Sequence, residues 1–405
     1  MKIILTNAPF YGEGFHGIRA GGRWPFIFNY PLQEENSLGG YNTMPFFLAY
    51  ATNYLISKSV GDVYYYDALA MKHRFETFYK TVGDIMPDIV LMETSTPSIE
   101  IDIKVATKLK EMGIEVCFTG PHATTYAETL IKNPNIDYIL KGEYEVSSYE
   151  MCVMRKKGIY ESKPIMDISG MYPYRDNTVY QYSDGFGQDA HIEMPQLQMQ
   201  SSRGCPYKCA FCLWNSTMTN KYRVNDSSHV IRELTWCMKT FGFKSVLFDD
   251  DTFNVGDKRT KEMSDLMGKI HIQWHAMVRP DACSWSAFEA MRRSGCVGLK
   301  MGVESFNQNS LDMLGKKYDV KELIATIDHV LKLGFKPFLS MMDNIPGETE
   351  DDKKRTKEIL DGFLARGASM QHPNCMPLPG TRLHEQLDTN EDWFEYGKFH
   401  GEVIK

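Results

Sequence analysis

Three cysteines stand close together near the middle of the chain, at Cys205, Cys209 and Cys212. The segment that contains them, SRGCPYKCAFC, has the spacing C-x3-C-x2-C. Three thiolates on one short loop can bind three irons of a cubane cluster, which leaves the fourth iron open for another ligand. A structural zinc site usually needs a fourth cysteine or histidine, and the next histidine along the chain is His229. The spacing therefore predicts a 4Fe-4S cluster with one open iron, and zinc is the alternative.

The elements around these cysteines predict a partial barrel. From Leu197 onwards, short apolar runs alternate with helical patterns, and the cysteines follow the first of the runs. Six such units favour an open, partial (β/α)6 barrel over a closed eightfold one. The predicted strands are 197–201, 245–248, 273–277, 298–302, 336–341 and 369–374, and the predicted helices are 227–240, 258–269, 284–294, 320–333 and 351–366.

The first 150 residues predict a separate α/β domain. Short strands alternate there with helices, which is typical of βαβ units and a doubly wound parallel sheet. Ligands of such Rossmann-like sheets bind beyond the carboxyl ends of the strands. We therefore expect domains at 1–150 and 196–385, a connector at 151–195 and a C-terminal tail at 386–405. The predicted strands are 2–7, 62–66, 89–93, 115–119 and 138–140, and the predicted helices are 45–58, 74–85, 98–112 and 125–132.

The cysteine motif, with Phe211 directly before its last cysteine, resembles that of the radical S-adenosylmethionine (SAM) superfamily. The resemblance implies that the open iron binds the amino and carboxylate groups of SAM, and that reductive cleavage gives methionine and a 5′-deoxyadenosyl radical. It also implies SAM contacts on loops that follow the barrel strands, where barrel enzymes assemble their sites. These are Phe211 beside the cluster, Asp249 and Asp250 near the SAM amino end, Glu304 on the ribose hydroxyls, and Lys316 on the SAM carboxylate.

The N-terminal domain resembles the cobalamin-binding domain of cobalamin-dependent radical SAM enzymes. Small and hydroxyl residues follow its third, fourth and fifth predicted strands, where this family lines a channel for the nucleotide tail. The D-x-H-x-x-G element that supplies a histidine ligand in other cobalamin proteins is missing. The resemblance therefore implies cobalamin bound without such a ligand. The implied contacts are Thr94, Ser95, Thr96, Gly120, Pro121, His122, Gly142 and Glu143.

Together these resemblances imply a cobalamin-dependent radical SAM methyltransferase. The deoxyadenosyl radical would remove hydrogen from an unactivated carbon, and methylcobalamin would deliver a methyl group to it. The first alternative is a cobalamin-dependent radical SAM enzyme that catalyses cyclisation or rearrangement without methyl transfer, as in the anaerobic ring cyclase of chlorophyll synthesis. The alternative from another class is a non-catalytic metal-binding protein. The substrate is expected to be a small molecule or a group presented by a partner, and the electron donor a flavodoxin or ferredoxin.

Composition limits the remaining classes of function. The balance of 45 Lys and Arg against 52 Asp and Glu gives a formal charge of −7, which argues against a broad nucleic-acid surface. The most apolar internal stretch, 44–56, is shorter than the roughly 20 residues that span a bilayer. The apolar run at the N-terminus is too short for a signal peptide. Nine cysteines, an odd and unevenly spaced set, fit reduced thiols and a metal site. We therefore expect a cytoplasmic protein without a membrane span.

Overall fold

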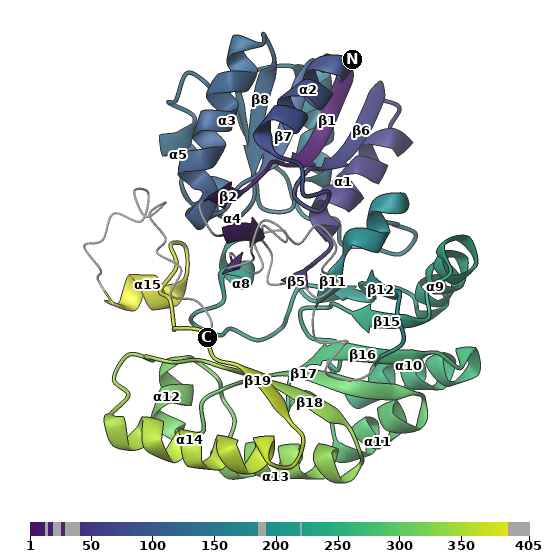
Figure 1. The fold of residues 1–405 in the computed structure, drawn as a ribbon, viewed down its shortest axis with the longest axis vertical. Helices are drawn as coiled ribbons and strands as arrows, with labels where there is room; N and C mark the ends of the chain where they lie inside the picture. Colours follow the sequence, from purple (N-terminus) through teal and green to yellow (C-terminus); the bar gives the residue numbers. More distant parts are fainter. Residues whose placement is uncertain (13–14, 19–25, 29–40, 185–191, 219–220, 388–405) are drawn as a thin grey trace.

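The computed structural model describes residues 1–12, 15–18, 26–28, 41–184, 192–218 and 221–387. It contains two α/β units, the N-terminal one in purple and blue and the C-terminal one in green and yellow (Figure 1). Residues 185–191 of the predicted connector and 388–405 of the predicted tail lie outside the described residues. No helix in the described ranges is long and apolar enough to cross a membrane.

The N-terminal unit is built on a six-stranded parallel sheet in the order β10-β9-β8-β7-β1-β6. β1 therefore lies between β6 and β7, and the chain reverses its direction of winding at the β1/β7 border. In open α/β sheets this border is the crevice where ligands bind. The strands are β1 (Lys2–Asn7), β6 (Asp62–Asp67), β7 (Ile89–Glu93), β8 (Glu115–Thr119), β9 (Tyr138–Lys141) and β10 (Gly158–Glu161).

Helices cover both faces of this sheet, which explains why its central strands are apolar throughout. Alternate residues of β1 enter different cores, with Ile4 on one face and Ile3 and Leu5 on the other. Strands buried on both faces need such continuous apolar runs. The first face packs against α2 (Phe75–Ile85), α3 (Ile99–Glu111), α4 (Pro121–Thr125) and α5 (Ala127–Leu130), and the second against α1 (Phe46–Ser57) and α6 (Glu145–Met154).

The sheet extends one strand further than the sequence analysis placed it. β10 lies within the predicted connector, pairs with β9 from Gly158 to Glu161, and forms the edge of the sheet. The rest of the described connector contains the 3-10 helix η3 (Asn177–Gln181) and β11 (Ser183–Asp184), which pairs with β5 (Tyr41–Asn42). Near the N-terminus, β2 (Tyr11–Gly12), β3 (Phe15–Ile18) and β4 (Phe26–Phe28) form a small antiparallel sheet.

The C-terminal unit is the open six-stranded parallel barrel that the sequence predicted, in the order β12-β15-β16-β17-β18-β19. Its strands match the predicted ones closely. β15 (Ser245–Phe248) and β18 (Lys336–Met341) have the predicted bounds, whereas β17 is longer at both ends. The other strands are β12 (Gln196–Met199), β16 (Gln273–Val278), β17 (Cys296–Glu304) and β19 (Ser369–Gln371).

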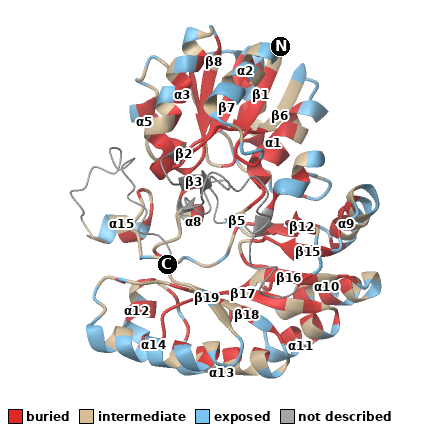
Figure 2. Cartoon of the chain, viewed as in Figure 1, coloured by how far each residue is buried: buried red, intermediate tan, exposed pale blue. Residues whose placement is uncertain are grey.

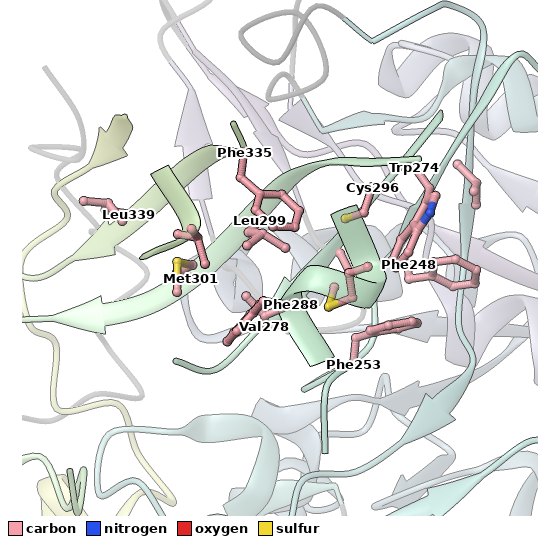
Figure 3. Close-up of a cluster of buried hydrophobic side chains, with 14 of the residues drawn as sticks. Phe248, Phe253, Trp274, Val278, Phe288, Cys296, Leu299, Met301, Phe335 and Leu339 are labelled. Atoms are coloured by element: carbon pink, nitrogen blue, oxygen red, sulfur yellow. The ribbon is translucent and has the colours of Figure 1, made fainter. Parts of the chain in front are cut away.

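Alternation along each barrel strand separates the hydrophobic core from the interior of the barrel. Leu299 and Leu339 point outwards into a core with the helices (Figure 3). Intervening residues such as Lys300 and Ser340 line the interior cavity instead. Figure 2 shows the buried strands in red and the exposed outer surfaces of the helices in pale blue. The outer helices are α9 (Ser227–Phe241), α10 (Asp257–Ile270), α11 (Trp285–Arg293), α13 (Val320–Lys332) and α14 (Glu350–Leu364).

Side-chain caps set the starts of three of these helices. Asp226 accepts a hydrogen bond from Ser228 N at the start of α9, and Asp319 accepts from Lys321 N and Glu322 N at the start of α13. Thr349 and Asp352 form a capping box at the start of α14. These side chains satisfy backbone N–H groups that have no partner inside the helix. The caps therefore fix the residue at which each of these helices begins.

The junction of the two units is a buried cluster of charges. Arg203, in β13 (Ser202–Arg203), donates to Glu145 at 2.5 Å and lies 3.5 Å from Glu143. Arg223, in β14 (Arg223–Val224), also pairs with Glu143. The Arg203 guanidinium lies 3.9 Å from the ring centre of Tyr50 in α1. We call Arg203, Arg223, Glu143 and Glu145 the junction cluster. All four side chains are nearly inaccessible to solvent, so the cluster holds the two units in a fixed register.

Candidate active site

The cysteine loop is closed at its base by a short ladder. After β12, Ser202 and Arg203 pair antiparallel with Val224 and Arg223, which encloses residues 204–222 in one loop. Gly204 has a φ of +74°, and a Cβ atom there would collide with the carbonyl oxygen of Lys221. Only glycine tolerates both the left-handed backbone and this close approach. The glycine before the first cysteine is therefore required by the turn that aims the cysteine loop.

Later segments of the barrel hold the middle of the cysteine loop. Ala210 N donates to Leu314 O at 2.8 Å, and Leu383 N donates to Ala210 O at 2.9 Å. Ala210 thus joins the segment after α12 (Gln308–Met313) to the start of α15 (Arg382–Leu387). With its base and its middle both bonded, the loop presents its cysteines from a fixed backbone.

All three cysteines line one cavity of about 260 Å³ at the carboxyl ends of the barrel strands. Burial raises the pKa of Cys205, and it raises the pKa of Cys212 to about 12. Because thiolates are the metal ligands, a bound cation would offset the cost of ionising these buried thiols. No three His, Cys, Asp or Glu side chains of the described ranges converge on one ion. A cubane does not need such convergence, since each thiolate binds a different iron. The donor set therefore fits the cluster.

Two of the predicted SAM contacts form a buried ion pair in the wall of this cavity. Lys316 Nζ lies 2.7 Å from Glu304 Oε1 and also donates to Gly302 O at 2.8 Å. Burial opposes the charge on Lys316, but the Glu304 carboxylate together with Tyr318 and Cys209 outweighs it, so the pKa of Lys316 is raised. Glu304 has a φ of +71° at a shift of register between β17 and β18, a conformation that is costly for a residue other than glycine. The strained backbone turns the Glu304 carboxylate into the cavity.

Phe211 lines the same cavity, and the Lys316 ammonium lies 5.9 Å from its ring centre. The aspartates after β15 have different positions from one another. Asp250 is fully buried and accepts hydrogen bonds from Ser201 N and Ser201 Oγ, at 3.1 and 2.9 Å, and from Ser202 Oγ. Neither Asp249 nor Asp250 is among the cavity residues, whereas Asp251 and Thr252 are. Asp250 therefore anchors the base of the cysteine loop, and Asp251 is the aspartate that faces the cavity.

Arg279, at a strand end, also lines the cavity, although it was not among the predicted site residues. It follows β16, and its Nη1 lies 3.5 Å from Cys209 Sγ. Asp281 accepts from Arg279 Nε at 2.5 Å and from Nη2 at 3.1 Å. Burial opposes the guanidinium charge, but Asp281 outweighs it, so the pKa of Arg279 is raised. Its position directly after a barrel strand is only weak evidence for a site residue, because arginines at such positions are also common on protein surfaces.

Trp214 connects the cavity to the N-terminal unit. It lies in α8 (Leu213–Thr217), directly after Cys212, and lines the cavity. Its Nε1 donates to Asp251 at 3.0 Å, and its ring meets Phe47 of α1 edge to face at 4.9 Å between centres. In Figure 1, α8 lies between the two units. The wall of the cavity nearest the cluster is therefore packed into the N-terminal sheet domain.

The predicted cobalamin contacts lie at the carboxyl ends of β7, β8 and β9. Thr94 donates to Thr119 O, and Thr96 is hydrogen bonded to His122 Nδ1 at 3.0 Å. Burial lowers the pKa of His122 to about 3, so this imidazole is neutral. Gly120 has a φ of +98°, and a Cβ atom there would lie 2.6 Å from Thr94 O. These loops are therefore small and closely packed. Ser95, Pro121 and Glu143 are also buried, and Gly142 has a φ of +66°.

The β1/β7 border adds one feature that sequence alone did not reveal. Asn7 ends β1 and is 2% exposed, and its side-chain oxygen has no hydrogen-bond partner in the described part of the chain. Glu143, in contrast, is engaged with Arg223 and Arg203. A buried acceptor at the switch point of the sheet suits a ligand with amide donors, which cobalamin carries. The side chains at these strand ends therefore fit such a ligand, although Glu143 is held in the junction cluster.

Comparison with known proteins finds a family match in the C-terminal part of the chain. Residues 199–360 match the family profile of the radical SAM superfamily. A relative named an uncharacterised methyltransferase, from Pyrococcus horikoshii, is 27% identical over 87% of this chain and 81% of its own length. The anaerobic magnesium-protoporphyrin IX monomethyl ester cyclase of Cereibacter sphaeroides is 23% identical over 99% of this chain and 66% of its own length.

A solved structure shows the same fold. The radical SAM methyltransferase TsrM from Kitasatospora setae, with cobalamin and a 4Fe-4S cluster bound, superposes with a TM-score of 0.69 at 14% identity. The match covers 94% of this chain and 76% of TsrM. The matched profile spans the strands from the end of β12 to β18, including the cysteine loop and Glu304. Residues 199–360 are therefore similar to the radical SAM superfamily, whose members bind a 4Fe-4S cluster and SAM, and the chain as a whole has the fold of TsrM.

Proposed function

We propose that this protein is a cobalamin-dependent radical SAM methyltransferase that acts on an unactivated carbon. The observation that carries the proposal is the cavity at the carboxyl ends of the barrel strands, one wall of which packs against the N-terminal unit. Its walls hold the three cluster thiols, the Glu304–Lys316 pair and Trp214, which also packs into the N-terminal domain. One cavity thus brings the predicted site of SAM cleavage next to the unit predicted to bind cobalamin. The relative from Pyrococcus horikoshii and TsrM, both named methyltransferases, support methyl transfer.

The bound groups would supply the chemistry, namely reductive cleavage of SAM at the cluster and methyl transfer by cobalamin. The residues of this chain would bind and orient the reactants. We assign Cys205, Cys209 and Cys212 to the cluster. The Glu304–Lys316 pair presents both a carboxylate for hydroxyl groups and an ammonium for a carboxylate, which are the groups that SAM carries at its two ends. Phe211 offers an apolar face beside them, and Asp251 an acceptor for the SAM amino group.

Cobalamin would lie at the carboxyl edge of the N-terminal sheet, over Thr94 to Thr96, Gly120 to His122 and Gly142. Gly120 packs closely against Thr94 there, so a residue with a Cβ atom would not fit at this position. Neutral His122 is held by Thr96 and contributes a hydrogen bond there at most. The substrate and the electron donor would be separate molecules that bind to this protein, and the donor would be a flavodoxin or ferredoxin.

A second candidate function is a radical cyclisation or rearrangement without methyl transfer. The cyclase of Cereibacter sphaeroides aligns with 99% of this chain, so the whole two-unit arrangement is compatible with that reaction. Both functions require the same cluster, SAM site and cavity. They differ in whether a methyl group leaves SAM.

Product analysis separates these functions. Anaerobically reconstituted protein would be incubated with cobalamin, a low-potential reductant and SAM that carries a CD3 group. Methyltransferase activity predicts 5′-deoxyadenosine, S-adenosylhomocysteine and CD3 label recovered on the corrinoid. Deoxyadenosine without S-adenosylhomocysteine or label would favour the second candidate. A protein that yields neither product and binds only zinc would be a non-catalytic metal-binding protein.

Matched cysteine variants make the assay specific. Cys209→Ala removes a thiol that lines the cavity, and we expect loss of the cluster and of deoxyadenosine formation. Cys237→Ala removes a thiol of the hydrophobic core, on α9, and we expect iron content and product yield close to wild type. Equal activity of Cys209→Ala and wild type would refute the cluster assignment.

A further inference from the structure

Arg279 is positioned to act on the predicted cluster itself. The guanidinium lies between two aromatic rings, with its central carbon 4.0 Å from the ring centre of Tyr207 and 5.0 Å from that of Tyr318. Asp281 holds two of its nitrogens, and the third, Nη1, faces Cys209 Sγ at 3.5 Å. Planar guanidinium groups suit such stacked and forked sites because their geometry is rigid. The direction of the N–H group towards Cys209 is therefore set by three neighbouring side chains.

A cation and an N–H donor beside a ligand sulfur raise the reduction potential of an iron-sulfur cluster. Hydrogen bonds to the sulfurs and the net charge of the site both set the reduction potential. A cluster with three thiolate ligands becomes more negative when it accepts an electron, and a fixed positive charge stabilises that reduced state. Arg279 is 6% exposed, so solvent screens its charge only weakly. Its neighbour Asp281 carries the opposite charge and reduces the effect.

We propose that Arg279 is a positioning residue that raises the reduction potential of the 4Fe-4S cluster through its contact with Cys209, and that Asp281 limits this increase. The inference rests on the proposed cluster but not on methyl transfer. Its consequence is functional, because the cluster must be reduced before SAM can be cleaved. Arg279 thus makes the cluster easier to reduce for whatever electron donor serves it.

The test is a redox titration of reconstituted protein, without SAM, followed by the EPR signal of the reduced cluster. Arg279→Met removes the charge and the donor, and we expect a more negative midpoint potential. Arg279→Lys keeps the positive charge but lacks the planar guanidinium group. We expect its midpoint potential to lie between those of wild type and Arg279→Met. Asp281→Asn leaves Arg279 stacked between its two rings but less neutralised, so we expect a more positive midpoint. Opposite shifts at neighbouring residues are a result that a purely structural role does not produce.

Arg293→Met is the matched control. Arg293 is an exposed arginine on α11, outside the cavity, and the variant changes the net charge by the same amount. We expect its midpoint to equal that of wild type. The iron content of Arg279→Met and Asp281→Asn is compared with that of wild type. If it is equal, midpoint potentials that are unchanged in both variants, or that shift in the same direction, would overturn the proposal. Loss of iron from every variant at these two positions would also overturn it, because a structural role would then suffice. A wild-type protein that forms no cluster would instead refute the proposed function.

Discussion

Buried charges occur in two regions of this protein, and their surroundings differ. In the junction cluster, Arg203 is enclosed by Glu145, Glu143 and the ring of Tyr50, and none of these residues lines the cavity. In the barrel, the Glu304–Lys316 pair is equally buried but faces the cavity. Glu304 also has a strained backbone, which the junction residues lack. The same type of interaction therefore joins domains in one region and presents binding groups in the other.

This difference indicates which charges can be lost without loss of the fold. A junction charge that loses its partner stays buried with nothing to replace it, which is costly. A cavity charge that loses its partner can be compensated by a ligand or by water. Substitutions in the junction should therefore reduce stability most, and those in the cavity should reduce binding most.

The largest effect on stability is expected for Glu145→Gln. It leaves the Arg203 guanidinium buried without its 2.5 Å carboxylate partner, and we expect a loss of about 3 to 5 kcal/mol in the free energy of unfolding. Urea unfolding of the apoprotein measures it. Glu150→Gln, an exposed position in the same helix, should change stability by less than about 0.5 kcal/mol. Equal stabilities of the two variants would show that the junction cluster does not hold the units together.

Glu304→Gln should have the converse phenotype. Lys316 keeps its hydrogen bond to Gly302 O, so the fold should tolerate the change, while SAM binding should weaken by about 10- to 100-fold. Isothermal titration of SAM into the reconstituted protein measures the loss. Glu358→Gln, on the outer helix α14, is the matched control and should bind SAM normally. Normal SAM affinity in Glu304→Gln would remove this pair from the SAM site.

The buried His122 predicts a dependence of stability on pH in the N-terminal unit. Its pKa is about 3 in the folded protein, below its value of about 6.5 when unfolded, so the unfolded state binds more protons as the pH falls through this range. The stability is therefore present above pH 6.5 and lost as the pH falls towards 3. Between pH 7 and pH 5 we expect wild type to lose about 2 kcal/mol relative to His122→Gln. Parallel pH profiles of the two proteins would contradict this environment for His122.

The smallest effect is expected at an exposed ion pair. Lys80 and Asp84 lie one turn apart on α2, and their side chains are 75% and 66% exposed. We expect Lys80→Ala to change the free energy of unfolding by less than about 0.5 kcal/mol, because solvent and salt screen such pairs. Urea unfolding at low and high salt measures it. A loss comparable to that of Glu145→Gln would show that burial does not separate the two kinds of pair.

The sequence predicted the parts of the fold that depend on regular patterns. β15 and β18 were located to the residue, because buried apolar strands between capped helices are distinct from both loops and helices. β10 was missed because Gly158–Glu161 is a short edge strand whose four residues include only one buried side chain. The N-terminal helix predicted at 125–132 begins earlier and divides into α4 and α5.

The site was predictable only where neighbouring residues form a motif. The cysteines, Phe211 and the strand-end Glu304 all line one cavity, and their roles there stay predictions. Three aspartates follow one another after β15, and the sequence did not indicate which of them faces the cavity. Asp250 is buried and accepts hydrogen bonds from Ser201 and Ser202, whereas Asp251 faces the cavity. That choice depends on where β15 ends. The contact of Arg279 with Cys209, and that of Arg203 with Glu145, join positions far apart in the chain and left no local signal.

The most direct test of the account is whether SAM binds to the cluster held by Cys205, Cys209 and Cys212. The EPR spectrum of the reduced, reconstituted protein would be recorded with and without SAM. Binding of SAM to an open iron predicts a changed spectrum in wild type and a change in Glu304→Gln only at higher SAM concentration. A cluster of normal iron content whose spectrum is unaffected by saturating SAM would contradict the central claim.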